Sequence, residues 1–150
     1  MSETYKVAIV KTREEREAAF ALRIQVFVEE QGVPLEEEID AYDTVATHYW
    51  VRQETAHVPL GMVGVARLVD KGGGVGKIGR VVVHADQRSC GVGAKMMRFI
   101  EEDAKQRGFC RIILEAQIIA EGFYLKLGYT PEGEIFMDCN IEHRLMWKAL

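Results

Sequence analysis

Hydrophobic and polar residues alternate in several short segments of the chain, a pattern typical of strands that bury one face. The first such segment begins at Tyr5 and ends near Lys11. Further segments with strand character cover residues 48–51, 60–69, 78–83, 112–114, 134–137 and 143–148. Because residues 81–83 form a continuous valine run, we expect a central strand that is covered on both faces. The pattern predicts about seven strands.

Between these segments, apolar residues recur at helical spacing in three places. The first helix begins after Thr12, a residue type that caps helices, and ends before Gly32. The other two helices are expected over residues 91–106 and 119–127, each ended by a glycine. The order of elements predicts an α/β fold with a mixed, largely antiparallel sheet of about seven strands flanked by helices.

Two connecting segments have their own composition. Residues 34–47 are acidic and have few large apolar side chains, so we expect a loop with at most one helical turn. Residues 70–77 read Asp-Lys-Gly-Gly-Gly-Val-Gly-Lys and are expected to form the turn of a hairpin. A phosphate-binding P-loop would require Ser or Thr after Lys77, where the chain has Ile78.

The composition predicts one globular domain over residues 1–150, with 48% hydrophobic and 28% charged residues. A net charge of −4 argues against a nucleic acid or an anionic membrane as the main partner. No apolar run approaches the roughly 20 residues of a membrane span, and residues 1–11 lack the apolar core of a signal peptide. The three cysteines are far apart in the chain, which suits a reducing, cytoplasmic location and predicts no metal site.

The segment from residue 78 to residue 107 contains the strongest local signal for a binding site. A buried strand leads into Arg-Ser-Cys-Gly-Val-Gly-Ala at residues 88–94, where a helix begins. Free backbone N–H groups at such a helix start can bind an anion, and small residues let it approach the backbone. The dinucleotide fingerprint fails because its third glycine is Met96. From this pattern alone, a plain tight turn is about as well supported as an anion site.

Two motifs in this half of the chain resemble one known family. Residues 88–93 are similar to the R-x-x-G-x-G acyl-CoA pyrophosphate motif of the GNAT superfamily of acetyl-CoA-dependent N-acetyltransferases. Residues 123–129, Phe-Tyr-Leu-Lys-Leu-Gly-Tyr, resemble its F-Y-x-K-x-G-[FY] segment. The two motifs occur in the expected order, and the predicted elements match the GNAT acyltransferase fold over nearly the whole chain.

Both ends of the chain resemble particular branches of that superfamily. Residues 22–34 are similar to the opening of ElaA-like proteins, a branch whose substrate is poorly defined. Residues 129–148 resemble both ElaA-like proteins and glyphosate N-acetyltransferase, in which the histidine matching His143 is the catalytic base. Those relatives usually have Pro directly before that histidine, whereas this chain has Glu142.

The resemblance implies acetyl-CoA as acyl donor, with no metal, and a role for particular residues. The backbone of Val81 and Val83 would bind the acetyl carbonyl and the pantetheine arm. The diphosphate-binding loop would consist of Arg88, Ser89, Gly91, Val92, Gly93 and Ala94. Tyr124 would protonate the leaving thiolate, since a phenol is protonated at neutral pH. His143 would accept the proton of the substrate ammonium, because imidazole titrates near neutral pH.

The acceptor side is less defined by the sequence. Glu30 could bind an ammonium group, whereas Arg23 and Arg80 could bind an acidic acceptor, and His48 could line the same cleft or pack beneath it. The acidic residues of segment 34–47 are more simply explained as a solvated charge run. Without the resemblance, Tyr124 is explained equally well as a core aromatic residue, and a structural histidine is the more common explanation at position 143.

The leading hypothesis is therefore an enzyme that acetylates a primary amine of a small molecule. A non-catalytic acyl-CoA-binding module would keep the loop but need neither Tyr124 nor His143. A protein N-acetyltransferase would need an open peptide groove. Homodimer formation stays open.

Overall fold

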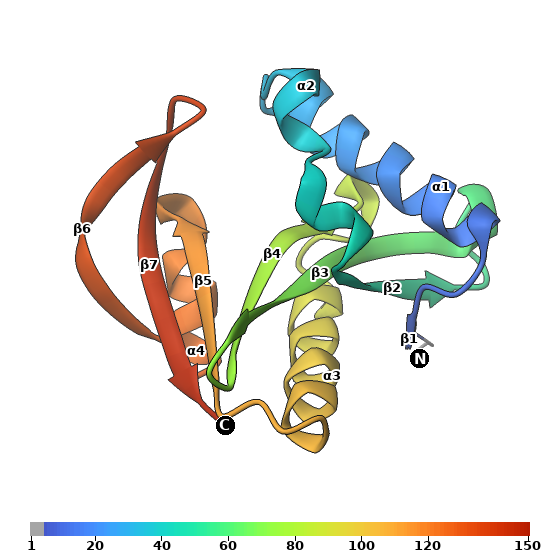
Figure 1. Cartoon of the computed structure of the whole chain (residues 1–150). Helices are drawn as coiled ribbons and strands as arrows, with labels where there is room; N and C mark the ends of the chain where they lie inside the picture. The colour runs from blue at the N-terminus through green and yellow to red at the C-terminus, as the bar shows by residue number, and fades with distance from the viewer. Residues whose placement is uncertain (1–4) are drawn as a thin grey trace.

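The computed structural model describes residues 5–150, and its seven strands form one sheet in the order β1-β2-β3-β4-β5-β7-β6 (Figure 1). The strands are β1 (Tyr5–Ile9), β2 (Thr47–Gln53), β3 (Met62–Gly72), β4 (Val75–Val83), β5 (Arg111–Gln117), β6 (Thr130–Asp138) and β7 (Ile141–Ala149). Only β4 and β5 pair in parallel. The predicted fold class is confirmed. Residues 1–4, which begin the segment predicted to hold no signal peptide, lie outside the described residues.

Helices cover both faces of this sheet. They are α1 (Arg13–Arg23), α2 (Leu35–Glu38), α3 (Val92–Gln106) and α4 (Glu121–Lys126). The first two lie on one face, and α3 crosses the other face between the two halves of the sheet (Figure 1). None of the helices described over residues 5–150 is long and apolar enough to cross a membrane.

The first predicted helix has the expected extent but changes its winding. Thr12 caps it, since its hydroxyl accepts the Glu15 amide at 3.1 Å and the Glu15 carboxylate bonds back to the cap. After α1 the chain continues as a wider π-helical segment, Ile24–Glu30, which ends where the Gln31 amide donates to Val26. π-helical turns are rare and are often found at functional sites.

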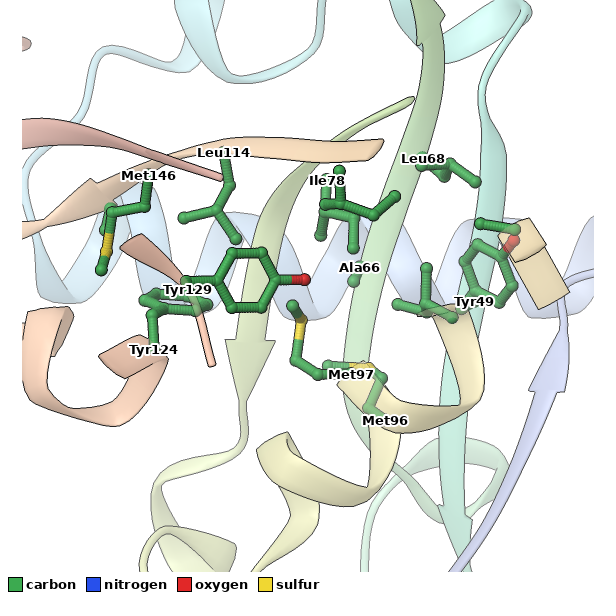
Figure 2. Close-up of a cluster of buried hydrophobic side chains, with 14 of the residues drawn as sticks. Tyr49, Ala66, Leu68, Ile78, Met96, Met97, Leu114, Tyr124, Tyr129 and Met146 are labelled. Atoms are coloured by element: carbon green, nitrogen blue, oxygen red, sulfur yellow. The ribbon is translucent and has the colours of Figure 1, made fainter. Parts of the chain in front are cut away.

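The sheet has an apolar core on each face. Beneath it, the α3 side chains Met96, Met97 and Ile100 are fully buried. Figure 2 shows this cluster, in which residues from five strands surround the α3 methionines; those labelled are Tyr49, Ala66, Leu68, Ile78, Leu114 and Met146. On the opposite face, α1 and the π-helical segment pack on β2, β3 and β4.

The two halves of the sheet separate between β4 and β5. These strands pair only from Val75 to Lys77, opposite residues 111–113 of β5. The prediction that residues 81–83 are covered on both faces is confirmed only in part: Val82 is buried in the core beside α1, and Val81 and Val83 pack against the core on the other face but remain partly exposed. The reason is that β5 has diverged from β4 before it reaches them.

The two connecting segments are more ordered than the sequence predicts. In segment 70–77 both strands extend further than expected, which leaves Gly73 and Gly74 as the turn. Segment 34–47 contains the single turn of α2 and a 3₁₀ turn, Ala41–Thr44. The expected solvated charge run is wrong for Glu38 and Asp43, which are buried, whereas Glu36 and Glu37 are exposed as expected.

A network of buried ion pairs holds this acidic segment against the sheet. Arg23, at the end of α1, bonds Glu38 at 2.9 Å and Asp43 at 2.7 Å. Arg67, on β3, bonds Asp43 at 2.9 Å and Asp40 at 2.7 Å. Arg23 is therefore structural and does not bind an acceptor. Burial raises the pKa of Asp43, but hydrogen bonds, first from Arg23, outweigh it and lower the pKa to about 2.

We predict that this network makes the protein sensitive to acid. The lowered pKa of Asp43 contributes roughly 2 kcal/mol of stability above pH 4, which is lost as the pH falls toward 2. Asp43→Asn should destabilise the fold at pH 7 by about 3–5 kcal/mol, because it leaves buried guanidinium groups incompletely paired. It should also flatten the change of unfolding free energy between pH 4 and pH 2, measured by urea denaturation.

The control for this prediction is Glu17→Gln, which breaks an exposed pair with Arg13. Exposed pairs contribute little, so its pH profile should follow that of the wild type. An unchanged acid slope in Asp43→Asn would contradict the prediction.

Candidate active site

A cavity of about 670 Å³ lies where β4 and β5 separate. Its lining includes Val81 and Val83 from β4 and Gln117 from β5. Tyr124 of α4 and His143 of β7 also line it. The cavity thus joins residues that are far apart in the sequence, and they come from both faces of the sheet.

The β4 edge that borders the cavity is open to a ligand. Beyond Lys77, β4 has no strand partner on its β5 side within residues 5–150. An extended ligand can pair with free backbone groups of such an edge. One acceptor there is already engaged, since Arg88 Nε donates to the Val83 carbonyl at 3.0 Å.

The start of α3 lies just beyond the end of this strand. Gly91 is its N-terminal cap and provides no side-chain oxygen, so the first amides of α3 have no side-chain cap within the described residues. Backbone N–H groups at a helix start can bind an anion such as a diphosphate.

Two positions of this loop require glycine, each for a different reason. Gly91 has φ +82°, which other residues rarely adopt, and a side chain there would meet no atom within 4 Å. A methyl group at Gly93 would lie 3.1 Å from the Phe123 ring of α4. Gly93 therefore allows α3 and α4 to pack closely, a reason that the glycine pattern alone did not reveal.

Glu30 is engaged by the same loop. Its two carboxylate oxygens accept hydrogen bonds from the Arg88 guanidinium, each at 3.0 Å. Hydrogen bonding by Arg88 lowers the pKa of Glu30 below its usual value. The pair joins the end of the π-helical segment to the predicted diphosphate loop, and Glu30 itself is not among the described residues that line the cavity.

Tyr124 is buried and faces the cavity. Its ring makes edge contacts with Phe123 and Tyr129, the latter visible in Figure 2. Its hydroxyl has no hydrogen-bond partner among residues 5–150, whereas Tyr129 donates to Glu101 at 2.6 Å. Burial raises the pKa of Tyr124 to about 12, so the phenol is protonated at physiological pH. The site therefore contains a neutral donor that residues 5–150 leave without a partner.

His143 lies on the other arm of the divided sheet. Its ring stacks on Phe136 of β6 at 5.8 Å, and its Nδ1 is 2.7 Å from the Ile141 carbonyl. A carbonyl oxygen only accepts, so Nδ1 carries the hydrogen and the lone pair of neutral imidazole is on Nε2. Glu142 forms no ion pair with this ring in the described chain.

The remaining acceptor candidates occupy different places. His48 packs against Phe20, and its Nε2 lies 2.9 Å from the Asp43 carbonyl. It is outside the described cavity lining and packs instead between α1 and the 3₁₀ turn that contains Asp43. Arg80 does line the cavity, but its guanidinium is bonded to segment 34–47.

Sequence reasoning missed two contacts that cross or border the cavity. Gln31 and Gln117 exchange side-chain hydrogen bonds, the shorter at 2.9 Å, and so link the π-helical segment to β5. Lys77 and Glu115 form an ion pair at 3.2 Å where the two halves of the sheet begin to separate. Nothing in the local sequence pairs residues this distant.

Comparison with known proteins agrees with this geometry. The family model described as the acetyltransferase (GNAT) family matches residues 13–129. A Bacillus subtilis relative, the uncharacterized N-acetyltransferase YjcF, is 40% identical over 144 residues, which cover 95% of this chain and 99% of the relative.

Solved structures of two other bacterial proteins have the same fold. An acyl-CoA N-acyltransferase from Pseudomonas aeruginosa superimposes with a TM-score of 0.84 and 26% identity, over 99% of this chain and 100% of that one. Escherichia coli ElaA gives a TM-score of 0.82 and 25% identity, over 97% and 99% of the two chains. The family match spans most of the chain and the relatives match it end to end, so this protein belongs to the acetyltransferase (GNAT) family.

Proposed function

We propose that this protein transfers an acetyl group from acetyl-CoA to a primary amine of a small molecule. The main support for this proposal is the cavity between β4 and β5. It is lined by the Tyr124 phenol and the His143 imidazole and borders an open strand edge. A non-catalytic binding module has no need of the free Tyr124 hydroxyl or of an available His143 lone pair. A peptide acceptor remains the alternative that an acceptor screen would reveal.

In this proposal the chain binds the donor through two kinds of backbone group. The free edge of β4 at Val81 and Val83 would pair with the pantetheine arm and hold the acetyl carbonyl. The uncapped amides at the start of α3 would hold the diphosphate, together with loop residues Arg88, Ser89, Gly91, Val92, Gly93 and Ala94. Support for this comes from the missing strand partner of β4 and from the Gly91 cap. Acetyl-CoA supplies the acyl group as a thioester.

Tyr124 would donate a hydrogen bond to the sulfur as it leaves. A thiol has an ordinary pKa of about 8.5, so complete proton transfer from a phenol whose pKa is about 12 is uphill. The hydrogen bond that stabilises the developing thiolate is therefore the larger part of its contribution. The absence of any partner for this hydroxyl among the described residues supports the assignment.

His143 would accept a proton from the acceptor ammonium through Nε2. The Ile141 carbonyl supports this role because it holds the hydrogen on Nδ1, so that the lone pair of the neutral ring is on Nε2. Acceptor-binding roles for Glu30, His48 and Arg80 remain predictions. The direct experiment is to screen an amine library with purified protein and acetyl-CoA, following thiol release. If no amine stimulates thiol release although acetyl-CoA binds, the binding-module alternative replaces this proposal.

The loop glycines should control binding of the donor. Gly91→Ala should weaken acetyl-CoA binding about 10-fold, because a left-handed conformation is unfavourable for alanine. Gly93→Val should weaken it as much by forcing α3 away from Phe123. Calorimetric titration measures both effects. Gly122→Ala is the matched control, since its new methyl group would meet nothing within 4 Å at an ordinary φ. Equal affinities in all the proteins would place the diphosphate elsewhere.

Tyr124→Phe should lower kcat by roughly 10²-fold and leave acetyl-CoA affinity nearly unchanged. The melting temperature should not fall, because the lost hydroxyl has no partner among residues 5–150. Tyr129→Phe is the opposite control: it breaks the bond to Glu101 and should lower stability by about 1 kcal/mol without affecting kcat. An undiminished kcat in Tyr124→Phe would show that another group interacts with the sulfur.

For His143, we predict a rate that rises with pH through the range in which imidazole titrates and then levels off. His143→Ala should remove this inflection from the pH profile of kcat/KM. The comparison variants are His48→Ala and Glu30→Gln. A carboxylate acting through water would titrate at lower pH, as the lowered pKa of Glu30 requires. Persistence of the inflection in His143→Ala and its loss in one of the other variants would transfer the role to that residue.

A further inference from the structure

Arg80 has an unusual backbone conformation at a sensitive place in the sheet. It has φ +53°, a left-handed value that is unfavourable for a residue with a side chain. In the pairing of β3 with β4, Gly79 lies opposite Arg67 and Val82 lies opposite Val65. Two residues of β4, Arg80 and Val81, therefore face one residue of β3, which is a β-bulge.

The bulge lies where β4 borders the cavity. Lys77 is the last β4 residue paired with β5, and only Ile78 and Gly79 separate it from the bulge. A bulge interrupts the ladder and turns the backbone groups beside it, and it is a common device next to active sites. The conformation of Arg80 thus sets the direction of the Val81 backbone, which the proposed function assigns to the donor.

The Arg80 side chain is bonded to the acidic segment in a way that can hold this conformation. Nε donates to the Glu38 carbonyl at 3.1 Å and lies 3.3 Å from the Glu38 carboxylate. Nη2 donates to the Glu37 carbonyl at 3.2 Å and to Asp40 at 3.3 Å. The guanidinium is therefore directed at the protein, with three quarters of its side chain covered.

The segment to which Arg80 is bonded is itself rigidly attached. Glu38 is also held by Arg23, and Asp40 is also held by Arg67. Removing Arg80 would leave both carboxylates paired with another arginine, so the fold should survive its substitution. Because these partners are fixed, the hydrogen bonds that Arg80 makes to them can offset the cost of its unfavourable backbone conformation.

We propose that Arg80 is a positioning residue: its bonds to segment 34–47 hold the β4 bulge in the conformation that presents the Val81 backbone to the acyl donor. This inference rests on the proposed function and adds to it a role for a residue that need not touch either substrate. The opposing hypothesis is that the positive charge of Arg80 binds the acceptor or the donor directly.

Glycine and alanine distinguish the two hypotheses at this position. Both substitutions remove the guanidinium, but only glycine adopts a positive φ without strain. Arg80→Ala should weaken acetyl-CoA binding about 10-fold because the bulge relaxes to a negative φ. Arg80→Gly should stay within about 3-fold of the wild type, since the native conformation remains accessible. Arg80→Lys keeps the charge and the strain but loses the forked contacts, and should behave like alanine.

The measurement is calorimetric titration of each purified variant with acetyl-CoA and, separately, with CoA. The acetyl-CoA affinity should fall more than the CoA affinity in Arg80→Ala. Val81 is farther along β4 from the proposed diphosphate loop than Val83 is, so its backbone would meet the acetyl end of the donor. Melting temperatures verify that each variant is folded. Arg98→Ala, on the exposed side of α3, controls for the loss of one positive charge against an anionic ligand.

Rescue by glycine, together with failure of lysine to rescue, supports the positioning role. Equal losses in the alanine and glycine variants, or wild-type affinity in the lysine variant, would overturn it in favour of direct charge recognition. Wild-type affinity in all three variants would also overturn it. Failure of the proposed function gives a different result, since the wild-type protein itself would then bind no acetyl-CoA.

Discussion

The separation of β4 from β5 is the constraint on which the rest of this structure depends. After three paired positions the strands diverge, and their facing edges lose the hydrogen bonds that a continuous sheet would supply. Unpaired backbone groups are unfavourable unless water or a ligand satisfies them. The open edge therefore destabilises the sheet and leaves backbone groups available to a ligand. Continued pairing of the two strands would satisfy these backbone groups, so side-chain packing must keep the two halves of the sheet apart.

Interactions on both faces of the sheet keep β4 and β5 apart. Beneath it, α3 fills the junction with Met96 and Met97, which contact both halves through one apolar core (Figure 2). Above it, the ion-pair network attaches segment 34–47 to β3 and β4. Arg23 connects that segment to α1. Apolar packing on one face and directional bonds on the other thus hold the same cavity in shape.

The two side chains of the proposed mechanism, Tyr124 and His143, lie in different environments. Tyr124 is surrounded by aromatic rings and raised in pKa by burial, which keeps its proton available. His143 is held at one nitrogen by a backbone carbonyl, which leaves the other nitrogen free. Neither group is connected to the other by a hydrogen bond in the described chain. Both side chains line the same cavity, so they can act in one reaction only when the substrates occupy that cavity.

Much of the architecture follows from local sequence alone. Alternation and helical spacing determine the strands, the extent of the first helix and its Thr12 cap, because each depends on neighbours within a few residues. The motif around Gly91 likewise predicts the turn at the start of α3 from residues that are adjacent in the chain, and its use as an anion site stays a prediction. Only the tertiary structure decided that Glu38 and Asp43 are buried, that Glu30 bonds Arg88 and that Gln31 meets Gln117. Those contacts join segments separated by up to 86 residues, so they depend on where β4 and β5 diverge, and no local pattern contains that information.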